Sequence, residues 1–321
     1  MTLKLHQRQI KIIKIKHYVS SKMKVAKLMC YSQDPDAGVN NEYPTPVESF
    51  KQPALHMIVG QRTAGKSYLT SKILAQAKKD KTFDRIYIVT PSFNSNKSYF
   101  GKYINDEDVF EPTKESIGDV IKSVENDRDE FENYLVKMKM YKQFQQDKHK
   151  NAKLIDEDNL IYYYENNFFN EVPKWKYQKV EPPKSLLILD DCLGSPAILQ
   201  SSGLTKIGTL NRHLAPLEEN YSNRSACGLA VIILTQSYRM NNGISRVLRE
   251  NLSLLTLFKN KQQKQLDAIK EELANVVDEE KFGKAYEFAT GEKFGSLTVD
   301  FVPKDPKFQF RKNLNELIIL D

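Results

Sequence analysis

The chain has 321 residues, of which 40% are hydrophobic and 28% are charged, and its formal net charge is +7. These proportions exclude a largely disordered polypeptide and leave enough apolar material for one large folded domain. The three cysteines lack the spacing of a metal or disulfide framework, and the sequence has neither a membrane-length apolar run nor a signal peptide, so we expect a soluble, intracellular protein.

The positive charge is concentrated at the amino terminus. Residues 1–33 hold eight Lys or Arg and no Asp or Glu, which leaves 40 basic against 41 acidic residues in the rest of the chain. Such an arm could contact DNA or an anionic membrane surface, or be only a solvated tail. Its alternating residues 10–16 predict an edge strand. We therefore expect a basic arm and linker over residues 1–46 and a single domain over 47–321.

The domain begins with a strand, a loop, a helix and a second strand. The apolar run Leu55 to Val59 predicts the first strand, the helical spacing of apolar residues from Tyr68 to Ala77 predicts the helix, and Arg85 to Thr90 predicts the second strand. This succession is typical of an α/β fold with a mainly parallel central sheet flanked by helices.

The stretch 101–183 is highly charged and helix-periodic, which predicts a mostly helical insertion. Its aromatic residues could stack bases, although packing against one another is the simpler explanation. After it, three strands are predicted at Ser185 to Asp190, Leu229 to Leu234 and Leu252 to Phe258. A helix with apolar spacing from Leu266 to Val276 and a last strand between Phe294 and Phe301 follow.

The loop after the first strand has the pattern GxxxxGK[ST]. It consists of Gly60, Gln61, Arg62, Thr63, Ala64, Gly65, Lys66 and Ser67. The glycines let backbone amides surround phosphate oxygens, the helix that follows directs its positive dipole end at them, and Lys66 adds a point charge. The Ser67 hydroxyl is a ligand for Mg²⁺. The sequence thus predicts a P-loop that binds ATP and Mg²⁺.

Two further strands end in polar residues. The strand from Ser185 ends in Asp190 and Asp191, of which Asp190 would hold Mg²⁺ and Asp191 would orient or deprotonate the attacking water. The strand from Leu229 is followed by Gln236, whose amide could sense the γ-phosphate. Transition-state charge also calls for a second cation, and the candidate arginine fingers are Arg212, Arg239, Arg246 and Arg249.

Taken in order, these motifs resemble a known family. They are Gly60 to Ser67, Thr90-Pro91-Ser92, Leu186 to Asp191, Asn211-Arg212-His213, Thr235-Gln236-Ser237 and Arg249-Glu250-Asn251. The set is similar to that of the poxvirus-type DNA-packaging ATPases of large DNA viruses and virophages, within the FtsK-HerA superfamily, and the likeness spans roughly residues 52–318.

The resemblance implies a RecA/ASCE-like P-loop ATPase that moves double-stranded DNA into a viral capsid. It implies a homo-oligomeric ring of five or six subunits with capsid proteins as partners. The ring would lie in the host-cell cytoplasm or virus factory, or be associated with the virion. Lys66, Asp190, Asp191 and Gln236 would be catalytic, with Arg249 the first choice for a finger acting in a neighbouring subunit and Arg212 the second. Many relatives carry Glu where this chain has Asp191, which leaves the role of Asp191 as a base open.

Three other functions are alternatives to a DNA-packaging ATPase. A signalling GTPase is disfavoured because Asn260-Lys261-Gln262-Gln263 lacks the Asp that reads guanine. A P-loop kinase of a small molecule remains an alternative because the loop does not identify the phosphoryl acceptor. A non-catalytic nucleotide-binding scaffold on the capsid is the third.

Overall fold

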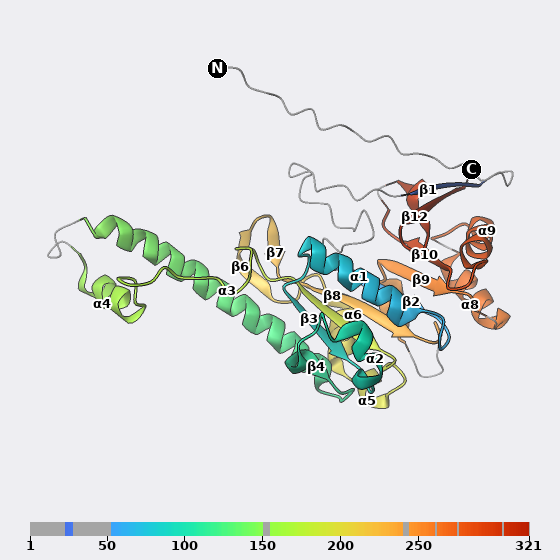
Figure 1. Ribbon diagram of the computed structural model, residues 1–321, viewed down its shortest axis with the longest axis horizontal. Coiled ribbons are helices and arrows are strands. Elements are labelled where there is room, and N and C mark those ends of the chain that lie inside the picture. Colours follow the sequence, from blue (N-terminus) through green and yellow to red (C-terminus); the bar gives the residue numbers. More distant parts are fainter. Residues whose placement is uncertain are drawn as a thin grey trace, which may run out of the picture.

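The structure, a computed structural model, describes residues 23–27, 53–149, 155–239, 244–260, 262–274, 276–303 and 305–320. A single sheet of 10 strands forms its centre. Its strands are Met23–Lys27 (β1), Leu55–Val59 (β2), Arg85–Val89 (β3), Val109–Phe110 (β4), Ser185–Asp190 (β5), Leu229–Thr235 (β8), Leu254–Phe258 (β9), Ser296–Asp300 (β10), Phe310–Lys312 (β11) and Glu316–Leu320 (β12). Their spatial order is β1-β12-β11-β10-β9-β2-β8-β5-β3-β4 (Figure 1).

The sheet has a parallel part and an antiparallel part. The strands from β9 to β4 run parallel to one another, whereas β10, β11, β12 and β1 extend the sheet by antiparallel pairing. The unbroken apolar runs of β5 and β8 are buried along their whole length, as central strands covered on both faces must be. Strand β8 lies between β2 and β5, and this order confirms the expected RecA/ASCE-like α/β fold class.

Helices cover both faces of the sheet. They are Lys66–Asp80 (α1), Phe93–Phe100 (α2), Ser116–Asp147 (α3), Glu157–Glu165 (α4), Pro196–Leu199 (α5), Ser202–Leu210 (α6), Arg246–Glu250 (α7), Gln263–Leu273 (α8) and Glu279–Thr290 (α9). Apolar residues of α1 and α2 form one core with alternate residues of the parallel strands, and those of α3, α6, α7, α8 and α9 form the other core on the opposite face. Short 3-10 helices span Asp106–Asp108 and Pro306–Phe308.

The stretch 101–183 holds α3 and α4, and Figure 1 shows α3 running out from the sheet with α4 at its far end. It also contributes β4, which pairs with β3 in the main sheet, and residues 166–184 contain no helix or strand. At the far end Phe144, Tyr163 and Phe168 form a small core of their own, in which the Phe144 and Tyr163 ring centroids lie 5.2 Å apart. Phe144, Tyr163 and Phe168 thus pack against one another, whereas Tyr164 and Phe169 of the same insertion are 80% and 59% exposed.

Some strands were not expected from the sequence. Strand β1 lies inside the basic arm, yet it pairs with β12 at the carboxyl end of the domain, and β11 and β12 had not been predicted. A hairpin of Pro216–Tyr221 (β6) and Arg224–Ala226 (β7) is likewise unforeseen. The edge strand predicted at residues 10–16 lies outside the described residues. The domain limits at residues 46 and 47 and the insertion at 101–183 stay predictions.

Candidate nucleotide-binding site

Three predicted motifs meet at the edge of the sheet where the parallel strands end. In the strand register Val59 lies opposite Thr235, and Asp190 lies opposite Leu234. The Gly60 amide donates to the Thr235 carbonyl at 3.0 Å, and the Asp191 amide donates to the Leu234 carbonyl at 3.1 Å. The glycine loop, the acidic pair and Gln236 are therefore neighbours, because β8 joins the strands that carry the other two.

The glycine loop needs its glycines for two different reasons. A Cβ on Gly60 would lie 3.0 Å from the Phe258 ring and 3.1 Å from the Ala64 side chain, so a larger residue would fit only if these neighbours moved. Gly65 has φ +111°, a conformation that L side chains rarely adopt. Gln61 accepts the Ala64 amide at 3.1 Å to close the turn. The loop thus passes directly from β2 into the amino end of α1.

Within the loop, Arg62 and Thr63 are exposed, and Thr63 has φ 65°. A left-handed conformation in a residue with a branched side chain is strained, and such strain is concentrated at ligand-binding sites. The Thr63 hydroxyl donates to the Arg62 carbonyl at 2.6 Å. The turn therefore holds its backbone in the curled form that can present amides to an anion.

Lys66 is the first residue of α1 and is almost fully buried. Its Nζ donates to the Gly60 carbonyl at 2.8 Å and lies 4.0 Å from Asp191 Oδ1. Burial lowers the pKa of Lys66, and the charges of Asp191 and Asp190 oppose that effect. The side chain thus directs its ammonium to the centre of the loop, between the loop backbone and the acidic pair.

Asp190 is buried at the end of β5, with 3% of its surface exposed. Its Oδ2 accepts hydrogen bonds from Asn96 Nδ2 at 2.7 Å and from Thr90 Oγ1 at 3.3 Å. Burial, and then the neighbouring charge of Asp191, raise the pKa of Asp190, while the two hydrogen bonds act against the rise. A buried carboxylate whose nearest donors are neutral favours a cation in its neighbourhood.

Asn96 was missed by the sequence reading. It lies on α2, a short helix that follows β3, and its amide makes the shorter of the two hydrogen bonds to Asp190. The polar run Ser92, Asn94, Ser95 and Asn96 after a strand end was the available signal. Nothing in its spacing singles out the one amide that reaches Asp190.

Asp191 and Gln236 form the outer part of the site. Asp191 adopts φ 48°, and its side chain is 42% exposed. Gln236 Nε2 donates to Asp191 Oδ2 at 3.4 Å. A carboxylate and an amide that share one hydrogen bond at a solvent-accessible edge are suited to hold a water molecule between them.

The donor set fits Mg²⁺. Ser67 supplies a hydroxyl in the first turn of α1, Asp190 supplies a buried carboxylate, and hard oxygen donors are what Mg²⁺ prefers. Among the described residues no group of three His, Cys, Asp or Glu could hold a metal without other ligands. Because Mg²⁺ is commonly held by one or two protein oxygens together with phosphate, Ser67 and Asp190 would hold it jointly with a nucleotide.

A cavity of about 700 Å³ adjoins the loop and runs along α1 from Gly65 to Lys79. Gly65, Tyr68, Phe258 and Phe294 are among its lining residues, and the Tyr68 and Phe294 side chains are 53% and 57% exposed. Phe294 has φ 64°, which is unusual for an aromatic residue. The size and the aromatic lining suit the nucleoside part of a mononucleotide whose phosphates lie in the loop.

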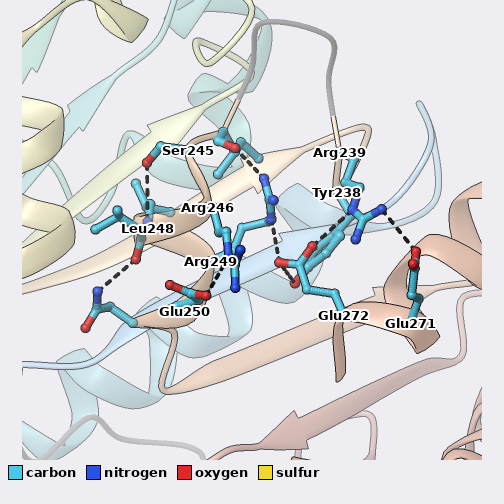
Figure 2. Close-up of polar contacts among 12 residues, drawn as sticks. Tyr238, Arg239, Ser245, Arg246, Leu248, Arg249, Glu250, Glu271 and Glu272 are labelled. Carbon is cyan, nitrogen blue, oxygen red and sulfur yellow. Dashed lines mark hydrogen bonds and ion pairs between the residues drawn. The ribbon is translucent and has the colours of Figure 1, made fainter. Parts of the chain in front are cut away.

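Two of the predicted finger arginines are engaged within the chain, as Figure 2 shows. Arg249 Nε donates to Glu272 at 2.7 Å, another of its nitrogens donates to the Ile244 carbonyl, and its guanidinium lies over the Tyr238 ring. Arg239 Nε donates to the same carboxylate at 3.0 Å, and the Tyr238 hydroxyl donates to it at 3.1 Å. Burial alone would raise the pKa of Glu272, but the hydrogen bonds from Arg249 and Arg239 outweigh it and lower that pKa.

The other two candidate arginines are Arg246 and Arg212. Arg246 is 80% exposed and pairs with Glu250 one helical turn away. Arg212 is exposed and follows Asn211, whose carbonyl accepts the amide of Leu229 at the start of β8. Since β8 has seven residues, this end of it lies about 20 Å from Gln236. Arg212 therefore lies at the opposite edge of the sheet from the glycine loop of its own chain.

No protein-family model matches the chain, and no curated protein does. Among solved structures, the chain is similar to the DNA-packaging ATPase B204 from Sulfolobus turreted icosahedral virus, with 13% identity over 82% of this chain and 98% of that one and a TM-score of 0.42. It is also similar to the pCW3 conjugation coupling protein TcpA, with 16% identity over 68% and 52% and a TM-score of 0.37. The cytoplasmic domain of the Thermomonospora curvata type VII secretion ATPase EccC matches with 12% identity over 80% and 25% and a TM-score of 0.37.

The identities of these structures lie below 25% and their TM-scores below 0.5, so the function proposed below depends on the residues of the site. Within the described part of the chain, no helix combines the length and the apolar character needed to cross a membrane.

Proposed function

We propose that the protein is an ATP-hydrolysing motor that moves double-stranded DNA. The observation that carries ATP hydrolysis is the convergence of Lys66, Asp191 and Gln236 at one sheet edge, with 4.0 Å from Lys66 to Asp191 and 3.4 Å from Gln236 to Asp191. A site that only stored nucleotide would have no need of a carboxylate and an amide placed beyond the lysine.

Each residue has a distinct role in this mechanism. The amides from Gly60 to Ser67 and the Lys66 ammonium bind the phosphates and stabilise the charge that grows on the γ-phosphate. Ser67 and Asp190 would hold Mg²⁺, which would neutralise phosphate charge. Asp191 and Gln236 orient the attacking water, and Asp191 accepts its proton.

We further propose that the motor works as a homo-oligomeric ring and packages a viral genome into its capsid. The support is the ordered set of motifs, which resembles that of the packaging ATPases and includes arginines placed away from the acidic pair. In a ring, the edge that carries Arg212 can face the glycine loop of the next subunit. Arg212 is our first choice for the finger, because it is exposed at that edge of the sheet.

The test is an ATPase assay with and without double-stranded DNA, combined with native mass measurement. We expect turnover that DNA stimulates and a mass of five or six subunits. Lys66→Ala should lower turnover at least about 100-fold, because one lost transition-state donor typically costs that much. Lys122→Ala is the matched control, since Lys122 is an exposed lysine on α3 whose one ion pair among the described residues is with the neighbouring Asp119.

Three results would contradict parts of this proposal. Full turnover in Lys66→Ala would refute the assignment of the site. Turnover that ignores DNA but rises with a small metabolite would favour the kinase alternative. Nucleotide binding without turnover would favour a capsid-associated scaffold.

A further inference from the structure

A groove of about 450 Å³ lies at the edge of the sheet opposite the glycine loop. The carboxyl end of α1, the turn into β3, the loop after α2 and residues 176–179 enclose it. Its lining holds six basic side chains, which are Lys78, Lys81, Arg85, Lys102, Lys176 and Lys179. Only two acidic side chains, Asp84 and Asp108, line it as well.

The two inner cations and both acids are already engaged. Arg85 pairs with Asp108 at 2.8 Å, and Lys176 pairs with Asp127 on α3 at 2.5 Å. Asp84 accepts the Lys184 amide at 2.9 Å. This network ties the segment after α4 to α3 and the start of β3.

The four outer lysines are different. Across the described residues, none of Lys78, Lys81, Lys102 and Lys179 makes an ion pair with a carboxylate. All four are exposed. The groove therefore combines two cations that pair with carboxylates and a rim of four exposed lysines that form no ion pair within the described part of the chain.

The Tyr103 ring contacts the ammonium groups of two of these lysines. The ammonium groups of Lys78 and Lys102 lie 5.7 Å and 5.0 Å from the centroid of its ring. Lys78 Nζ also donates to the Lys102 carbonyl at 3.2 Å. Two like charges held on one ring repel each other, and an anion placed between them relieves that repulsion.

Helix dipoles do not account for all of this charge. The carboxyl ends of α1 and α2 both point here, and each carries about half a negative charge, so together they offset about one of the four lysines. Lys179 belongs to neither helix end, and its charge acts on the neighbouring Glu181 carboxylate, whose pKa it helps to lower.

We propose that this groove binds the sugar-phosphate backbone of double-stranded DNA, an inference that rests on the proposed motor function. None of the large exposed apolar side chains lines the groove, whereas a protein partner would need an apolar centre to dock on. Lysine ammonium groups on flexible stems suit phosphate contacts that carry no sequence information. The near-neutral net charge of the domain did not indicate this rim, because acidic residues elsewhere in the domain balance the charge of its lysines in the sum.

The test uses the full chain with Lys78 and Lys102 both changed to Gln. Binding of a labelled DNA duplex is measured by fluorescence anisotropy over a range of salt concentrations. We expect several-fold weaker binding at low salt and a salt slope smaller by about 2, because each lost phosphate contact removes about 0.9 from it. Basal ATP turnover should not change, since the groove and the glycine loop lie at opposite edges of the sheet.

The matched control changes Lys122 and Lys284 to Gln. Both pair with acids of their own helices, Asp119 and Glu280, and the double change removes the same charge. It should leave the salt slope nearly unchanged. Binding of a labelled oligoglutamate peptide to the same variants provides the comparison with an acidic protein partner.

The outcomes separate the groove from the motor. If the Lys78 and Lys102 variant binds DNA with the affinity and slope of the unsubstituted chain, the groove inference is wrong and the motor proposal stands. If the unsubstituted chain binds no DNA, both are wrong. If only oligoglutamate binding weakens in the variant, the groove is a surface for an acidic protein and the DNA inference is overturned.

Discussion

The stability of the strand that carries the glycine loop should depend on pH through His56. This histidine lies on β2 and has no exposed surface, and its Nε2 lies 2.8 Å from Thr256 Oγ1 on β9. Thr256 Oγ1 in turn lies 2.7 Å from Thr298 Oγ1 on β10. The chain of contacts joins the parallel part of the sheet to the antiparallel part, and burial lowers the pKa of His56 from 6.5 to about 3.

The sign of the effect follows from proton binding. Between pH 6.5 and about pH 3 the unfolded chain binds a proton at His56 that the folded chain does not, so the folded state loses stability as the pH falls through this window. The loss is about 1.4 kcal/mol per pH unit, or about 2 kcal/mol between pH 6.5 and pH 5. That is a substantial part of the stability of an ordinary domain.

Urea unfolding at pH 7 and pH 5 measures this loss. The comparison is His56→Gln, because a glutamine amide can still bond to Thr256 but does not titrate. We expect the variant to start less stable at pH 7 and then to lose about 2 kcal/mol less than the unsubstituted chain on going to pH 5. An equal loss in both proteins would refute the reasoning and assign the acid sensitivity to other groups.

Two further predictions concern the arginines. Chains with Lys66→Ala and chains with Arg212→Ala should each be inactive alone but regain part of the ATP turnover when they are mixed. A mixed ring contains some subunit junctions in which both residues are intact. If mixing restores no turnover, Arg212 is not a finger that acts between subunits. Arg249→Ala should lower the free energy of unfolding by about 1–3 kcal/mol, the usual value of a hydrogen bond to a charged group, because Glu272 loses a donor. Unchanged urea unfolding together with lost turnover would refute this structural role of Arg249 and favour a catalytic one.

Local chemistry explains why much of the fold could be predicted. The strands β2, β3, β5, β8 and β9 are short apolar runs bounded by polar residues, and the glycine loop has an unmistakable spacing. Each of these signals lies within about ten consecutive residues. The proximity of the loop, Asp191 and Gln236 could also be predicted from the sequence, because parallel strands bring their carboxyl ends to one edge of the sheet.

The antiparallel strands β11 and β12 and the pairing of β1 could not be predicted in the same way. They are three to five residues long, and β1 and β12 lie almost 300 positions apart in the sequence. Pairing over such a separation depends on which sheet edge is open after the rest of the domain has folded. No local sequence pattern indicates which sheet edge will be open.

The sequence by itself determined the glycine loop, the acidic strand end and the parallel core. Only the tertiary structure decided that Asn96 supports Asp190, that Glu272 engages Arg249, and that lysines from three segments gather around one groove. The physical reason is that a strand or a loop is a property of neighbouring residues, whereas a hydrogen bond or a charged rim depends on side chains that only folding brings together.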